Sequence, residues 1–159
     1  MSRPIVSGVS ADSPAAQVGV RPGDAIVSIN GKAPNDIIEY QQFIDGPSVT
    51  LNLERGDPPQ DFTVVVEKTE GQPLGITIDS AVFDRIRTCD NHCSFCFIYQ
   101  LPKGLRKSLY VKDDDFRLSF LYGNYTTLTR FTEFDLERVI DERLSPLYVS
   151  IHVTNPHAV

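Results

Sequence analysis

The stretch "SPAAQVGVRPGDAIVSINGKAP", residues 13–34, predicts a helix, a turn, a strand and a second turn in close succession. Ser13 is a preferred helix-capping residue, and Pro14 takes the first helical position, where its missing amide hydrogen is no loss. Gly19 ends the helix soon afterwards. The stretch therefore begins with a short helix and continues into β-structure.

The segments that surround this helix are strand-like. Pro22-Gly23-Asp24 predicts a turn, residues 25–29 alternate as a strand does, and Asn30-Gly31 supplies the two positive φ values of a tight hairpin turn. A helix with one apolar side is expected at Asp36–Ile44. Further strands are expected in "PIVSGVS" (4–10) and in the hairpin of "SVTLNLER" (48–55) and "DFTVVVEK" (61–68). Together these elements predict a small half-open β-barrel with two helices over residues 1–69.

The order and spacing of these elements resemble a PDZ domain of the kind found in bacterial proteases. The resemblance implies that an extended peptide adds as a strand between Ile5–Val9 and Asp36–Ile44. Such domains hold a peptide carboxylate in a loop before the binding strand, but Pro4, in that position here, has no amide hydrogen to donate. "PLGI" (73–76) is similar to that loop although it follows the expected domain, so it is either that loop or a plain linker or strand start.

The second part of the chain, residues 70–159, alternates strand-like and helix-like stretches. The expected strands are "AVFDRI" (81–86), the apolar run "FRLSFLYGN" (116–124) and "LYVSIHV" (147–153). Between the last two lies a helix, "TEFDLERVIDERL" (132–144), which Thr132 caps and whose first turn is acidic. A strand, helix, strand order predicts a parallel βαβ unit with a right-handed crossover.

All three cysteines of the chain, Cys89, Cys93 and Cys96, lie within the eight residues "CDNHCSFC". Their spacing is too tight for a structural disulfide framework, so metal or redox chemistry is the leading explanation. Three thiolates on one short loop can each hold one iron of an iron–sulfur cube, but they are too few for a four-thiolate site. A cube held in this way keeps one iron open for another ligand.

The C-x3-C-x2-C motif, with aromatic Phe95 before the third cysteine, resembles the radical S-adenosylmethionine (SAM) superfamily. The wider stretch from Cys89 to "LSPLYVSIHVTNP" resembles a bacterial family of PDZ-plus-radical-SAM-like proteins, described as iron–sulfur oxidoreductases. The resemblance implies a [4Fe-4S] cluster held by Cys89, Cys93 and Cys96, S-adenosylmethionine on the open iron, and Phe95 near the adenine. The implied reaction is reductive cleavage of S-adenosylmethionine, followed by radical chemistry on a substrate that the sequence does not identify.

A complete radical SAM barrel needs about six βα units, on the order of 200 residues by the size of βα barrels. Residues 70–159 have room for about half of these units. We therefore expect an incomplete radical SAM (βα) barrel after the PDZ-like domain. The chain is expected to be the N-terminal portion of a longer protein and to be poorly equipped for turnover by itself.

Four further residues are candidate cofactor contacts. Radical SAM barrels commonly bind the amino group of the cofactor at a glycine-rich turn, and "LYGN" offers Gly123 and Asn124 there, which also suit a plain strand-ending turn. Alternation in residues 147–153 places Ser150 and His152 on one side of a strand. On that side they would face a barrel interior, either as cofactor contacts or as packing.

A zinc site with His92 as the fourth ligand is the main alternative for the cysteines. It would make the protein a non-catalytic PDZ adaptor with a structural metal. Adjacent His92 and Cys93 would strain one tetrahedral ion, and three metal-free thiols this close would oxidise readily, so both alternatives rank below the cluster. The charged run "KGLRKSLYVKDDDFR" (103–117) is either a solvated loop or the source of a cation for a bound carboxylate.

Composition limits the remaining classes of function. The chain has 159 residues, of which 41% are apolar, and a net charge of −6, which argues against a nucleic-acid partner. No apolar run reaches the roughly eighteen residues of a membrane span, and the N-terminus does not resemble a signal peptide. We therefore expect a cytoplasmic protein.

Overall fold

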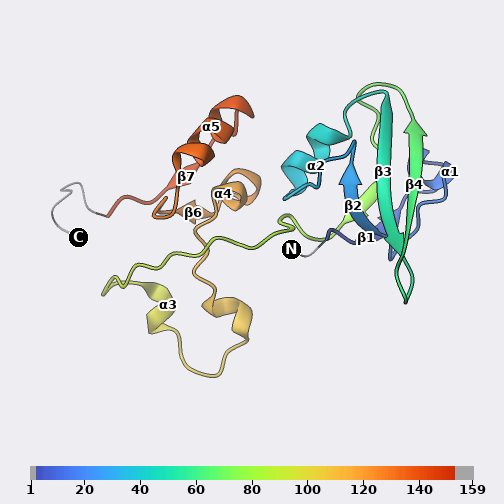
Figure 1. Cartoon of the computed structure of the whole chain (residues 1–159). Coiled ribbons are helices and arrows are strands. Elements are labelled where there is room, and N and C mark those ends of the chain that lie inside the picture. Colours follow the sequence, from blue (N-terminus) through green and yellow to red (C-terminus); the bar gives the residue numbers. More distant parts are fainter. Residues whose placement is uncertain (1–2, 153–159) are drawn as a thin grey trace. The chain divides into compact units, whose positions relative to one another are not determined.

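The computed structural model describes residues 3–152 of the chain (Figure 1). The chain divides into two compact units, one that runs to Arg85 and one that begins at Ile86. The first unit extends past residue 69, the expected end of the PDZ-like part, because Leu74 and Phe83 are buried in its core. Each unit is described by itself.

The first unit is a β-structure with two short helices. Its elements are β1 (Val6–Val9), α1 (Pro14–Gln17), β2 (Ala25–Ile29), α2 (Ile37–Phe43), β3 (Ser48–Arg55), β4 (Gln60–Glu67) and β5 (Ile76–Ile78). Strands β2, β3 and β4 form an antiparallel sheet with β3 in the centre, whereas β1 and β5 form a separate antiparallel pair (Figure 1). The strands and helices that the sequence predicts between residues 4 and 68 are therefore confirmed, and β5 is an additional strand.

The core of the first unit lies against the central strand β3. Alternation along β3 turns Val49, Leu51 and Leu53 inward, and the side chains of all three are fully buried. Leu74 and Phe83, from the segment after β4, are 1% and 2% exposed and complete the same core. Burial of two such large apolar side chains contributes about 3–6 kcal/mol to the unit.

Local hydrogen bonds explain where the first elements begin and turn. The Ser13 hydroxyl accepts from the Ala16 amide at 3.2 Å, and the Asp36 carboxylate accepts from two amides at the start of α2. Asn30 and Gly31 have φ values of 51° and 79°, as the predicted hairpin turn requires. The Ser13 cap and the Asn30-Gly31 turn depend on a few neighbouring residues, which is why the sequence alone predicts them.

An ion pair with a buried carboxylate ties β3 to the turn before β2. The guanidinium of Arg55 donates to both carboxylate oxygens of Asp24, at 2.6 and 2.7 Å, and to the carbonyl of Gly19 at 2.8 Å. Asp24 has only 1% of its side chain exposed. Burial alone would raise the pKa of Asp24, but the hydrogen bonds and the charge of Arg55 outweigh burial and lower that pKa.

The second unit has short elements joined by long irregular segments. They are α3 (Phe97–Gln100), the 3-10 helix η1 (Lys107–Tyr110), α4 (Phe116–Tyr122), β6 (Tyr125–Thr126), α5 (Glu133–Asp141) and β7 (Tyr148–Val149). Strands β6 and β7 pair in parallel, with α5 between them in the chain. The expected βαβ order is present, and Thr132 caps α5 in a capping box as predicted.

Two strand predictions in this part of the chain are wrong. Residues 81–86 contain only a single bridge, from Val82 to Asp36, and residues 116–122 form α4. The Asp115 carboxylate accepts from the Arg117 amide at 3.0 Å and so begins a helix, which Gly123 ends in the left-handed conformation. A short apolar run fits either a strand or a buried helix, and here the cap decides between them.

The described strands lie in one sheet of three strands and two sheets of two strands. None of these sheets closes into a barrel. The partial barrel expected for residues 70–159 is therefore represented, among residues 3–152, only by the parallel pair β6–β7. Within the same range, no helix has both the length and the hydropathy that crossing a membrane requires.

Candidate functional site

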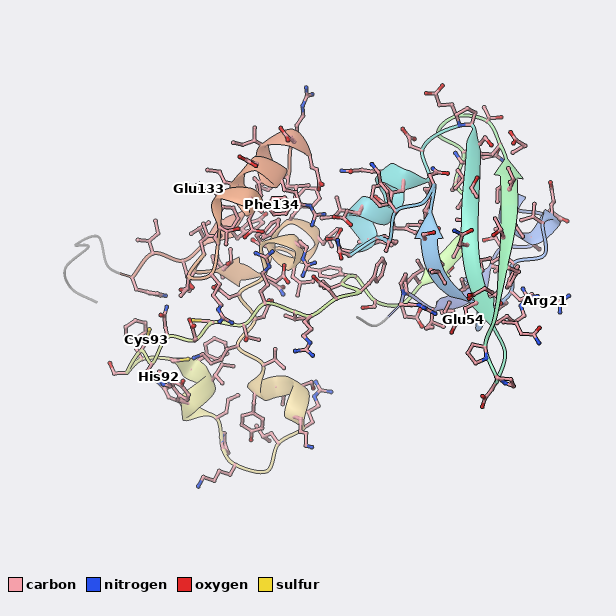
Figure 2. The ribbon with its side chains drawn as sticks, viewed as in Figure 1. Arg21, Glu54, His92, Cys93, Glu133 and Phe134 are labelled. Carbon is pink, nitrogen blue, oxygen red and sulfur yellow. The ribbon has the colours of Figure 1, made fainter. Side chains whose placement is uncertain are left out.

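The cysteine loop, residues 89–99, begins at an anchored residue and ends in α3. The Cys89 amide donates to the Lys112 carbonyl at 2.8 Å, next to an isolated bridge between Thr88 and Asp113. The Cys96 amide donates to the Cys93 carbonyl at 3.1 Å, which makes a tight turn before α3. Figure 2 shows His92 and Cys93 side by side near this short helix.

The three thiols fit an iron–sulfur cluster by their chemistry. All three are free and partly exposed, so each can reach a metal without breaking a disulfide. In the described residues no three His, Cys, Asp or Glu side chains lie close enough together to hold a metal ion. Metal sites often assemble only when the metal binds, because a preformed site costs folding free energy. The donor set thus suits a cluster, provided that the loop draws its thiols together.

His92 already has a partner within the protein. Its Nδ1 lies 3.0 Å from the Tyr99 hydroxyl, and the two rings stack with an interplanar angle of 3° and a centroid separation of 5.8 Å. A fourth zinc ligand would need one imidazole nitrogen directed at the thiols. The stacked arrangement with Tyr99 makes His92 part of the loop's own support.

A buried carboxylate, Asp114, organises the segment that faces Cys89. Asp114 is 5% exposed and accepts from the amides of Thr127 and Thr129, at 2.5 and 3.2 Å, and from the Thr126 hydroxyl at 3.0 Å. The Thr127 hydroxyl lies 4.0 Å from the Cys89 sulfur. The sequence interpretation of residues 103–117 as a charged run missed this role. The threonines after β6, which can donate to a carboxylate, are the pattern that could have indicated it.

Arg87, two residues before the first cysteine, ties the entry to the loop to α5. Its guanidinium donates to the Asp135 carboxylate at 2.5 Å, and its amide donates to Asp115 at 3.0 Å. Burial would raise the pKa of Asp135, but the hydrogen bonds from Arg87 and Thr132 outweigh burial and lower the pKa to about 2. The cysteine loop therefore starts from a fixed position.

The structure brings some of the predicted cofactor contacts together. Phe95, which is 56% exposed, lies with its ring centroid 4.9 Å from that of His152. Gly123 is the C-cap of α4 rather than the end of a strand, and the Asn124 side chain donates to the Asp113 carboxylate at 2.6 Å. The Ser150 amide donates to the Thr126 carbonyl at 2.9 Å, which extends the β6–β7 pairing by one residue.

The first unit contains a groove of about 360 Å³ between α2 and the segment that leads into β5. Its lining includes Tyr40, Ile44, Gln72, Leu74, Gly75 and Ile76. The prediction that a peptide pairs with the strand Ile5–Val9 is wrong, because that strand already has partners. Strand β1 pairs with β5, and the Val6 amide donates to the Asp24 carbonyl. The helical wall at Asp36–Ile44 is as expected.

"PLGI" (73–76) forms one end of this groove. The carbonyls of Leu74 and Gly75 accept from α1 and from Ser10, whereas the amides of Leu74 and Gly75 donate to no atom of residues 3–152. Gly75 has φ +81°, so that consecutive amides can form a concave anion-binding site. Strand β5 pairs only with β1 in the described part of the chain, which leaves its other edge open.

Comparisons with known proteins also distinguish two parts of the chain, but the match to the second part begins at residue 68 rather than after Arg85. The sequence pattern of a family described as "Radical SAM-like domain" matches residues 68–158, and that of the PDZ domain matches residues 5–55. The first match covers the cysteine loop and also β5, and the second covers β1, β2, β3 and both helices of the first unit.

Three individual proteins show the range of the similarity. The periplasmic serine endoprotease DegP of Salmonella typhimurium is 46% identical over 55 residues, which are 33% of this chain and 12% of DegP. A protein named as a putative zinc metalloprotease from Agrobacterium fabrum is 28% identical over 116 residues, 68% of this chain and 31% of that protein. The crystal structure of the PDZ domain of the SdrC-like protein from Listeria monocytogenes has a TM-score of 0.43 and 27% identity, over 50% of this chain and 90% of that one. The chain thus spans less than a third of the length of these two proteases.

Proposed function

The chain belongs to the radical SAM-like family, and from this premise we propose that Cys89, Cys93 and Cys96 hold a [4Fe-4S] cluster that binds S-adenosylmethionine. The observation that supports the proposal is a set of three free, partly exposed thiols on one loop within the matched residues. Thiolates favour iron–sulfur clusters, and three of them keep one iron open. When bound, a reduced cluster supplies the electron that cleaves S-adenosylmethionine and starts radical chemistry on a substrate.

The residues around the loop would position these groups. Phe95, within the loop, and His152 have their ring centroids 4.9 Å apart with an interplanar angle of 55°, and they offer an aromatic surface for an adenine. Gly123 and Asn124, at the end of α4, and Ser150, beside β7, are the candidate polar contacts for the methionine part of the cofactor. The proposal places the protein in the cytoplasm, where thiols stay reduced.

Cluster assembly tests this proposal. We expect anaerobic reconstitution to give a brown protein with about four iron and four sulfide per chain, and S-adenosylmethionine to change the EPR spectrum of the reduced cluster. Replacing Cys89, Cys93 or Cys96 singly with alanine should abolish the cluster. His92→Ala is the matched control in the same loop and should retain it.

The alternative is zinc in the cysteine loop of a non-catalytic PDZ adaptor. A colourless protein with one zinc that is lost on His92→Ala would establish this alternative and refute the cluster. The zinc-protease name of the Agrobacterium relative is not carried over to this chain, because the chain spans only 31% of that protein.

A second function, peptide binding, is favoured by the groove of the first unit. We propose that an extended peptide adds to the open edge of β5 beside α2, with its terminal carboxylate at the amides of Leu74 and Gly75. Because the peptide carboxylate lies at Leu74 and Gly75 in this arrangement, the missing amide hydrogen of Pro4 does not matter. The peptide contacts residues 71–78 and α2.

NMR titration of the full chain with a library of hexapeptides tests this binding mode. The amides of residues 74–78 should shift most, and those of Ile5–Val9 less. The same peptides with an amidated C-terminus are the control and should bind more weakly, because the amide cannot replace the carboxylate. Equal binding of both forms would contradict carboxylate capture.

A further inference from the structure

Lys112 contacts the cysteine loop at the first cysteine, between the first two cysteines and after the third. Its carbonyl accepts from the Cys89 amide at 2.8 Å, and its Nζ donates to the Asn91 carbonyl at 2.5 Å. The same ammonium donates to the Tyr99 hydroxyl at 3.1 Å. Asn91 lies between the first and second cysteines and Tyr99 lies after the third, so one side chain joins the two arms of the loop.

Tyr99 extends this link across the loop. The Lys112 ammonium lies 4.8 Å from the centre of the Tyr99 ring, a favourable cation–π contact. The Tyr99 hydroxyl in turn contacts His92 Nδ1 at 3.0 Å. Four residues from both arms and from outside the loop, Lys112, Asn91, Tyr99 and His92, therefore form one connected cluster beside the cysteines.

The ammonium of Lys112 lies beside the segment between the first two cysteines. Its Nζ contacts the carbonyl of Asn91, two residues after Cys89 and two residues before Cys93. Arg130, another cation of this unit, also contacts the cysteine loop, through an ion pair with exposed Asp90 at 3.5 Å.

We propose that Lys112 is the positioning residue of the cysteine loop. Its side chain holds the two arms of the loop together and keeps a positive charge beside the cluster ligands. The mechanical part of this inference stands on the contacts of Lys112, and the electrostatic part rests on the proposed cluster. Reduction adds negative charge to a cluster, so a nearby cation stabilises the reduced form and makes the reduction potential less negative. Lys112 would then help the cluster to accept the electron that it must deliver.

Three variants of the full chain separate these effects. Lys112→Met removes the ammonium and keeps a long side chain, Lys112→Arg keeps the charge, and Lys107→Met removes an exposed lysine from η1 that makes none of these contacts. Hydrogen exchange of the cluster-free protein measures the order of residues 89–99. A redox titration monitored by EPR measures the potential of the reconstituted cluster.

We expect Lys112→Met to speed amide exchange in residues 89–99 several-fold and to shift the potential to a more negative value. Lys112→Arg and Lys107→Met should remain close to wild type in both measurements. The inference would be overturned if amide exchange in residues 89–99 were as slow in Lys112→Met as in Lys107→Met, or if the reduction potential of the cluster did not change in Lys112→Met. A wild-type chain that takes up no iron would refute the proposed cluster, whereas exchange in the cluster-free protein would still decide the role of Lys112 in the loop.

Discussion

Gly75 offers the sharpest test of the groove, because a side chain there would collide with α1. In Gly75→Ala the new Cβ would lie 2.3 Å from the Cβ and 2.6 Å from the hydroxyl oxygen of Ser13, the residue that caps α1. Gly71→Ala is the matched control. Gly71 has φ +74°, close to the +81° of Gly75, but nothing lies within 4 Å of its Cβ position.

Both variants place an alanine in the left-handed backbone region, and only Gly75→Ala also creates a steric overlap. Alanine in the left-handed region costs about 1–2 kcal/mol at either position. Gly75→Ala adds an overlap with a Cβ atom, which cannot rotate away, so the backbone of "PLGI" or of α1 must shift at a cost of about 1–3 kcal/mol. We therefore expect the free energy of unfolding of the first unit to fall by about 1–2 kcal/mol in Gly71→Ala and by about 2–5 kcal/mol in Gly75→Ala.

Native-state hydrogen exchange at the Leu51 and Leu53 amides measures this difference. These residues lie in the central strand of the fully buried core, so their slowest exchange reports unfolding of the whole unit. A difference of about 1.4 kcal/mol corresponds to tenfold in exchange rate. Equal exchange in the two variants would show that the loop does not approach Ser13 closely, and would refute the proposed shape of the groove.

Two further predictions concern pH and domain extent. Asp135 has a pKa of about 2 in the folded chain, below its ordinary 3.8, so its stabilisation is complete above about pH 4 and is lost as the pH falls through about 2. As the pH falls from about 4 to about 2, the free energy of unfolding of the second unit should fall by about 2 kcal/mol more in the wild type than in Asp135→Asn, as measured by hydrogen exchange at α5. If the difference between the two proteins does not change with pH, the ion pair of Asp135 with Arg87 is contradicted. A fragment of residues 3–69 lacks Leu74 and Phe83 and should be less stable to urea than a fragment of residues 3–85 by about 3–6 kcal/mol, whereas equal stability would support a domain boundary at residue 69.

The sequence by itself determined the features that depend on neighbouring residues. Ser13 and Thr132 cap their helices as predicted, Asn30-Gly31 makes its tight turn, and the 48–68 hairpin forms. The sequence also placed all three thiols on one loop, because eight consecutive residues contain them. In each case the interactions span only a few positions, so a local pattern is sufficient.

Tertiary structure decided which segments meet across the chain. "PLGI" seemed to lie after the first domain, yet β5 pairs with β1 about seventy residues earlier, at Ile78 and Val6, and so creates the groove. The sequence predicts a strand at residues 116–122, but Asp115 caps a helix there, and the packing of the second unit buries Phe116, Leu118 and Ser119 of that helix. The sequence predicts that the charged run 103–117 is either a solvated loop or the source of a cation for a bound carboxylate. Long-range contacts instead place Lys112 beside the cysteines and Asp114 next to Thr126. A charged side chain that is exposed to solvent has no particular role that the sequence could reveal. It gains a specific role only when a distant segment supplies its hydrogen-bond partner, and the packing of the chain, not the neighbouring residues, decides which partner that is.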